Sequence, residues 1–371
     1  VTENQRLLVE NSDSLGKTDN IATIPNSSRA GSAGTVPLGM RGYMDTTGYL
    51  KHSGSNVVTI NGSSLRAKLA VSEDSDTSPL SISAVNNTNI DNSGHNVLVV
   101  AVGGGRLILE GEDASTTSLN LGNGTSNNNF KAAKIAVQAI NNPTVKNDAT
   151  IVDTGTVIGS GTIVSSKACG GAELIAKDKN TFDALAVELL AESGSEANDG
   201  KYTTEATSHA VSVTVGDITV NKVRTFNEMN TSLNVGAVRF INGSSFSDAI
   251  ISAKNLTDSN AYIHSVNVGV AGSGNNFAQT HDKSNVSITV AAGTTGLNAK
   301  NLEINAINSG AVDAKAVGTD VGILEISPFA ARVEHESNSS TTVNLSGKIN
   351  ASGELITNAQ RNDTLNLMAD A

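Results

Sequence analysis

The chain is poor in the residues from which most globular cores are built. Aromatic residues make up only 3% of its 371 residues, Trp is absent, and charged residues reach just 16%. An average globular domain takes much of its core from aromatic side chains and about a quarter of its residues from charged ones. This chain uses Val, Ile, Leu and Ala instead, set among Asn, Ser, Thr and Gly. Such a mixture suits many short β-segments with tight corners.

Cysteine is almost absent as well. The single Cys169 cannot form an internal disulfide. Secreted eukaryotic repeat proteins usually carry several disulfides, whereas a bacterial exoprotein that is exported unfolded would tend to avoid them. We expect Cys169 to be a small buried or half-buried residue and not a nucleophile.

Basic clusters and long apolar runs are also lacking. The net charge is −11, and the 25 Lys and Arg residues are scattered singly, which argues against nucleic acid and anionic lipid as partners. No run approaches the ~18 consecutive apolar residues of a membrane-spanning helix, so we expect no transmembrane segment. The 38% hydrophobic residues come in regular pulses, which argues against disorder. The chain opens at Val1 without an export signal. We therefore expect a processed product or an excised fragment, and the fragment is the favoured interpretation.

The main positive signal is an internal repeat of about 55 residues. Six segments share a pattern of apolar and other residues in alternation, usually closed by Asn, and their starts lie 55, 50, 64, 53 and 53 residues apart. They are LSISAVN (80–86), IAVQAIN (135–141), LAVELLA (185–191), AIISAKN (249–255), LEINAIN (302–308) and LITNAQR (355–361).

A second recurrent element is a Ser/Thr-rich alternating strand that ends in Gly. Its copies are SNVVTING (55–62), STTSLNLGNG (115–124), HAVSVTVG (209–216), TSLNVG (231–236), SNVSITVAAG (284–293) and STTVNLSG (340–347). Apolar residues in such strands point to one side and Ser, Thr or Asn to the other, with a period of two.

These elements predict an all-β fold, a right-handed parallel β-helix (solenoid) built from repeats of about 55 residues. We expect each repeat to hold two or three coils, with Asn at the corners, so that about 15–18 coils would form a rod roughly 70–85 Å long. Residues 51–371 would form this array. Residues 1–50 lack the unit and would be an irregular leading segment or a degenerate repeat.

A helical alternative stays open for two segments. FKAAKIAVQAI (130–140) and TFDALAVELLAESG (181–194) also fit a helix, the second with Phe182, Leu185 and Leu189 on one face. The aligned copies are strand-like, which favours a strand. A short helix on the outside of the rod remains the alternative for one of them.

The units over 284–327 and 330–371 resemble the repeats of the leukotoxin-type filamentous adhesins of fusobacteria and related anaerobes, which are similar in organisation to filamentous haemagglutinins. The resemblance is clearest over 284–371, recognisable over 115–172 and faint before residue 50, and 172–283 departs from it in spacing. It implies a secreted, β-helical surface protein, exported through an outer-membrane secretion partner. It also implies a virulence role in attachment to a host-cell receptor or matrix, or in toxicity to leukocytes.

No set of residues indicates catalysis, a cofactor or a metal, so we predict no site residues of these kinds. The acidic run Glu73-Asp74-Ser75-Asp76 lacks the glycine and distal Glu of a calcium loop and is best explained as a solvated corner. VGGGR (102–106) has no Lys-Ser/Thr after it, unlike a phosphate loop. The histidines are spread through the sequence without metal-ligand spacing. They are His52, His95, His209, His264, His281 and His335.

The function that this pattern favours is a non-catalytic adhesin or toxin segment that is secreted or held on the bacterial surface. Two alternatives remain. One is a β-helical glycan-degrading enzyme or tailspike, which would need clustered carboxylates and aromatic platforms for sugars. The other is the variable surface region of a flagellin-like or surface-layer protein, which would form separate small domains.

Overall fold

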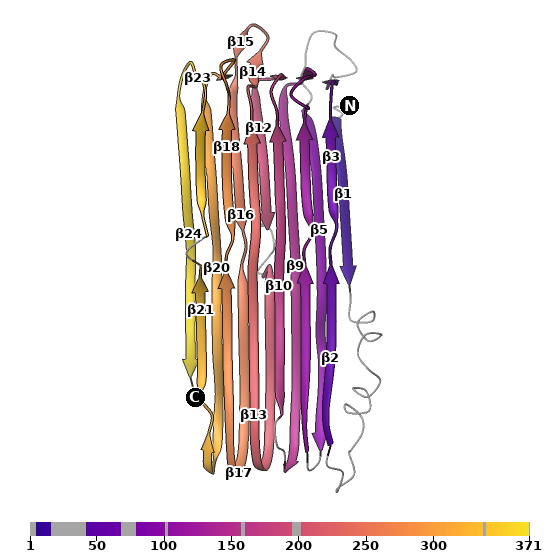
Figure 1. Ribbon diagram of the computed structural model, residues 1–371, viewed down its shortest axis with the longest axis vertical. Helices are drawn as coiled ribbons and strands as arrows, with labels where there is room; N and C mark the ends of the chain where they lie inside the picture. The colour runs from indigo at the N-terminus through magenta and orange to yellow at the C-terminus, as the bar shows by residue number, and fades with distance from the viewer. Residues whose placement is uncertain are drawn as a thin grey trace.

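The structure is a computed structural model that describes residues 5–15, 42–67, 79–100, 103–156, 160–194, 202–336 and 339–370. Most of the described residues lie in strands, and none of them lies in a helix. The strands run side by side along the longest axis of the molecule (Figure 1). Pairing between the named strands is parallel, except for the short hairpin of β14 and β15. The predicted all-β parallel solenoid is confirmed.

Each coil runs down one long face, bends, returns along the other long face, and crosses a short sheet at the far end. The downward face consists of the first halves of β13 (Thr204–Val235) and β17 (Ser259–Asp282) together with β1 (Gln5–Leu15), β5 (Leu80–Val100), β9 (Lys134–Thr156), β12 (Ala186–Gly194), β16 (Asp248–Leu256), β20 (Leu302–Ile326) and β24 (Leu355–Asp370). The upward face consists of the second halves of β13 and β17 together with β2 (Gly42–His52), β3 (Ser55–Ile60), β6 (Gly103–Asp113), β7 (Thr116–Leu121), β10 (Gly161–Ala176), β18 (Asn285–Ala291), β21 (Phe329–His335) and β22 (Thr341–Ser346).

The short sheet has seven strands and closes the upper end in Figure 1. Its members are β4 (Ser64–Arg66), β8 (Asn128–Lys131), β11 (Asn180–Asp183), β14 (Arg239–Asn242), β15 (Ser245–Phe246), β19 (Leu297–Ala299) and β23 (Ile349–Ala351). Three phenylalanines stack along it, with ring centroids 5.0 Å apart for Phe130 and Phe182 and 5.4 Å apart for Phe182 and Phe240.

One repeat is one coil, so the prediction of two or three coils per repeat was wrong. Leu80 pairs with Ile135, and Leu302 pairs with Leu355, the next copy of the same repeat. A coil of this length is wide and flat, because the chain covers 23 residues in β9 before it bends. The molecule is therefore longest along its strands, not along the stacking direction of a narrow rod.

The repeat at 185–191 is displaced from its predicted alignment by two residues. Val187, and not Leu185, pairs with Ile135 of the preceding coil and with Ala249 of the next. Leu185 is instead 61% exposed. Because side chains alternate with a period of two, a shift of two residues leaves the inward and outward assignments of the other positions unchanged.

The two segments with a helical alternative both form strands. Residues 130–140 contribute to β8 and β9, and residues 181–194 contribute to β11 and β12.

One of the Ser/Thr-rich segments was grouped wrongly, because His209–Gly216 lies on the downward face, whereas the other copies lie on the upward face. In the preceding coil, which runs through β9 and β10, the upward copy is the segment from Gly171 to Ala176, which pairs with Thr116–Leu121 and was not recognised in the sequence.

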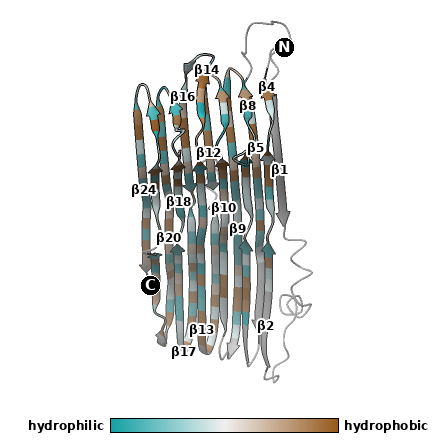
Figure 2. Ribbon diagram, turned by 45° about the horizontal axis from the view of Figure 1, so that its top comes forward, coloured by the Kyte–Doolittle hydropathy of each residue, from teal (hydrophilic) through white to brown (hydrophobic). Residues whose placement is uncertain are grey.

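The interior consists of apolar layers separated by rows of buried asparagine. Along β9, Val137 and Ala139 belong to one apolar cluster, and Ala149 and Ile151 belong to another. Asn141 and Asn147 lie between them, fully buried. Figure 2 shows how apolar and polar residues alternate along the strands. These asparagines sit inside extended strands, so for them the prediction of Asn at the corners was wrong. In the described part of the chain, Lys179 is the one residue other than glycine with a positive φ.

The leading segment contributes to the same stack. β1 pairs in parallel with β5, and β2 pairs in parallel with β6. The described strands of residues 1–50 therefore extend the array that was predicted to begin at residue 51.

Candidate functional site

The outward side chains of the upward face carry a series of ion pairs. Strand alternation turns every second residue of β2, β6, β10, β13, β17 and β21 outward, and the parallel register stacks these residues in columns. The central column is Lys51, Glu112, Lys167, Phe226, His281 and Glu334. We call this column and its flanking residues Cys169, Glu228, Lys283 and Glu336 the charged face.

Ion pairs between a lysine on one coil and a glutamate on the next link successive coils on the charged face. The Lys51 Nζ lies 2.9 Å from the Glu112 Oε2, and the Lys167 Nζ lies 2.7 Å from the Glu228 Oε2. The hydrogen bond from Lys51 holds the pKa of the Glu112 carboxyl below its usual value, and it raises the pKa of the Lys51 ammonium. Exposed pairs of this kind contribute little to stability. Their charges remain available to a ligand.

The pairing continues in the last coils. The Nε2 of His281 lies 3.0 Å from the Oε1 of Glu336, and the Nζ of Lys283 lies 3.4 Å from the Oε2 of the same carboxylate. The imidazole of His281 packs against the ring of Phe226, with ring centroids 5.7 Å apart. The charged face therefore extends over six coils, with rings among the charges.

An open groove of about 280 Å³ crosses the first four coils of the charged face. Tyr49 and Phe226 lie among the residues that line it, together with the carboxylates of Glu110, Glu112 and Glu228 and the ammonium of Lys167. The arrangement offers hydrogen-bond donors, acceptors and two rings to an extended polar ligand.

Cys169 borders this groove and is half-buried, as the sequence indicated. Its Sγ lies 3.7 Å from the Oε1 of Glu112. Burial raises the pKa of the Cys169 thiol to about 11. The thiol is therefore protonated at neutral pH, and a thiol is a far weaker nucleophile than a thiolate.

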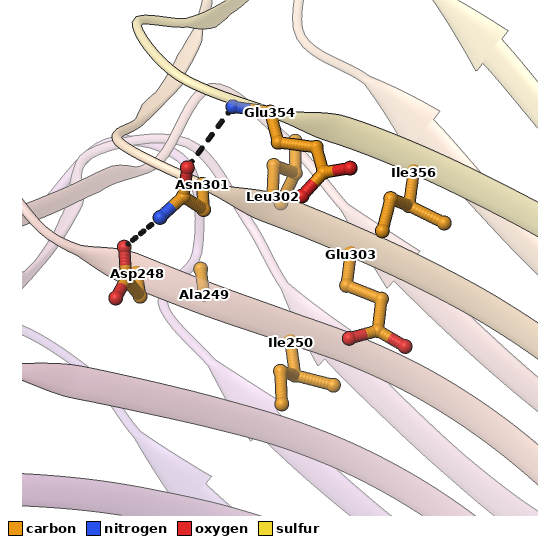
Figure 3. A pocket seen from close by; sticks show the side chains of 8 residues that line it. All are labelled: Asp248, Ala249, Ile250, Asn301, Leu302, Glu303, Glu354 and Ile356. Carbon is orange, nitrogen blue, oxygen red and sulfur yellow. Dashed lines mark hydrogen bonds between the residues drawn. The ribbon is translucent and has the colours of Figure 1, made fainter.

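A second depression, of about 190 Å³, lies where β16, β20 and β24 begin (Figure 3). Asn301 bridges three coils here, because its Nδ2 donates to the Oδ1 of Asp248 at 2.8 Å and its Oδ1 accepts from the backbone N–H of Glu354 at 3.0 Å. The Glu303 Oε1 accepts a hydrogen bond from the Asn305 Nδ2 at 2.6 Å. The side-chain amide of Asn301 and the carboxylate of Glu303 thus already have hydrogen-bond partners within the fold.

The described histidine side chains do not gather into one site. His52 pairs with the buried Asp113, at an Nδ1–Oδ1 distance of 2.7 Å. His209 and His264 are neighbours on successive coils of the downward face, with ring centroids 6.0 Å apart. The side chains of His95 and His335 lie outside the described residues. Within the described part of the chain, no group of three or more His, Cys, Asp or Glu side chains is placed to hold a metal ion.

The remaining segments considered in the sequence do not add a site. Glu73-Asp74-Ser75-Asp76 lies outside the described residues. Gly103, Gly104 and Gly105 form the start of β6 and pair with Gly42, Tyr43 and Met44, so they form a strand rather than a phosphate-binding loop. The stacking of charges was missed in the sequence, because residues such as Lys51 and Glu112 lie 61 positions apart.

Comparison with protein-family models, with curated protein sequences and with solved structures finds no match to this chain. In the described residues, no helix is long and apolar enough to cross a membrane.

Proposed function

We propose that this chain is a segment of a secreted or surface-held bacterial adhesin or leukotoxin, and that it acts by presenting the charged face to a host cell. The observation that carries the proposal is the stacking of paired charges and rings over six coils. Equivalent polar groups at every coil favour many weak contacts made together, which raise the overall affinity without a deep pocket.

In this proposal the chain crosses the bacterial outer membrane through a dedicated secretion partner and then binds a receptor or matrix component of the host. It performs no catalysis. Contacts between exposed charges need complementary charge on the ligand and are screened by dissolved ions, so attachment should weaken as salt rises.

A charge-reversal experiment tests the role of the charged face. We expect Lys51→Glu, Lys167→Glu and Lys283→Glu, combined in one variant, to reduce attachment of the purified chain to host cells. The matched control is Lys146→Glu, Lys254→Glu and Lys315→Glu, which changes the net charge equally but on the downward face. Equal losses in both variants would show a net-charge effect, and no attachment by the original chain would end the proposal. Turnover of any polysaccharide in a cleavage screen would contradict the non-catalytic part.

A further inference from the structure

At the end of the molecule opposite the seven-stranded sheet, three neighbouring coils of the described chain carry exposed aliphatic side chains. Here the chain turns from the downward to the upward face in β13, β17 and β20, at the lower end of Figure 1. We call the exposed large aliphatic residues of these bends the apolar tip. They are Val213, Val215, Ile218, Val220, Val268, Val270, Val321, Ile323, Leu324 and Ile326.

The parallel register places these residues side by side. Val213 pairs with Val268, and Val268 pairs with Val321. Their exposed fractions are 48%, 38% and 54%, and Ile323 reaches 80%. Exposed aliphatic residues that stand singly are ordinary, but a contiguous group of this kind marks an interaction surface.

The apolar tip has exposed aliphatic residues on both faces of the bend. They occur in all three coils on the downward face, but only in β13 and β20 on the upward face, where β17 places Ser273 and Asn275. Before the bend, Val213 and Val215 point outward from the downward face, while Thr214 between them is buried. After the bend, Ile218 and Val220 point outward from the upward face. A partner with a flat surface would cover only one of these two faces.

We propose that the apolar tip inserts into the surface of a lipid bilayer. The downward face of the apolar tip, two alternate residues wide and three coils deep, measures roughly 200 Å² at ~4.8 Å between coils and ~6.6 Å between alternate residues, and the apolar part of the upward face is smaller. A stable protein interface buries about 800 Å² on each partner. The fluid interior of a bilayer, in contrast, surrounds a thin apolar wedge on both faces and at its edge.

The backbone of the tip is suited to this environment. β13 pairs with β17, and β17 pairs with β20, both before and after the bend, while Val215, Val270 and Ile323 lie outside the paired positions. Strands whose backbone groups are paired across the sheet carry less of the cost of entering an apolar medium.

The charge of the tip and of the whole chain determines which kind of lipid surface the tip can bind. The segments 211–220, 266–275 and 319–327 contain no Lys or Arg, and their charged residues are acidic: Asp217, Asp320 and Glu325. With a net charge of −11 on the whole chain, an anionic surface would repel the protein. The partner is therefore a zwitterionic lipid surface, held by apolar contact and insensitive to salt. This inference goes beyond the adhesive role, because it concerns a different surface from the charged face.

Flotation with phosphatidylcholine vesicles tests the proposal. We expect the original chain to float with the vesicles at both low and high salt. A variant with Val215→Ser, Val270→Ser and Ile323→Ser should lose binding by about tenfold or more, since bilayer affinity scales with the buried apolar area. All three side chains are at least 51% exposed, so the fold should be kept, which circular dichroism would check.

The matched control is Val57→Ser, Leu185→Ser and Ile250→Ser, which removes exposed aliphatic side chains elsewhere and should float like the original chain. Failure of the original chain to float, or equal flotation of the tip variant, would overturn the proposal. So would concentration-dependent self-association that the tip variant abolishes without vesicles, because a second copy would then be the occupant. Loss of flotation with intact cell attachment would separate this proposal from the role of the charged face.

Discussion

Asn255 donates its side-chain N–H to the side-chain oxygen of Asn308 on the next coil, at an Nδ2–Oδ1 distance of 2.9 Å. Both residues are buried. The same bond links Asn86 to Asn141 at 2.7 Å and Asn221 to Asn276 at 2.8 Å. Because buried amides are costly without partners, each such row favours one register of the coils over all others.

Removal of one amide should therefore destabilise the fold. Asn308→Ala takes away the acceptor of Asn255 and the donor to the backbone oxygen of Ser284. We expect a loss of about 2–3 kcal/mol in the free energy of unfolding. Urea unfolding followed by circular dichroism measures it. Asn305→Ala, an outward neighbour, serves as the control and should change the stability by less than ~0.5 kcal/mol.

The alternation of β20 gives a second prediction. Leu302, Ile304 and Ala306 point inward with at most 1% of their surface exposed, whereas Glu303 points outward. Ile304→Asp should place an unpaired charge in the core and cost several kcal/mol. Glu303→Lys should leave the thermal unfolding midpoint nearly unchanged. Similar losses in the two variants would contradict the assignment of the faces.

The phenylalanine stack makes a third prediction. Phe182 is fully buried between Phe130 and Phe240. Phe182→Ala should leave a cavity and cost about 3–5 kcal/mol, measured by urea unfolding. Phe246→Ala, at a side chain that is 39% exposed, is the control. A cost below that of the control would mean that the three rings do not form a continuous row.

A fourth prediction concerns the pH dependence of Cys169. Because burial raises the pKa of this thiol from 9.0 to about 11, the folded state favours the protonated form. Its contribution to stability is fully present below pH 9.0 and is lost as the pH rises from 9.0 towards 11. The rate of thiol alkylation, followed by mass spectrometry, should rise with a midpoint near 11 in the folded chain and near 9.0 in urea. A folded midpoint below that of the unfolded chain would refute the assignment.

Local alternation was enough to predict much of the fold. The period of two in LEINAIN and LSISAVN identifies inward and outward residues whatever strand lies beside them, because each side chain is directed by its own backbone. The recurrence near 55 residues then predicts parallel stacking of like segments. The composition in turn predicted a core of aliphatic side chains.

Only the tertiary structure decided how those segments meet. Parallel pairing joins residues from 52 positions apart, as for Ile135 with Val187, to 75 positions apart, as for Gln5 with Leu80. No local pattern sets such a distance. The tertiary structure therefore decided that a repeat is a single coil and that Val187 rather than Leu185 aligns with Ile135. It also decided that residues 181–194 are extended. The charged face and the apolar tip arise in the same way. Their members are single residues in the sequence, and they become surfaces because the coils stack in one register.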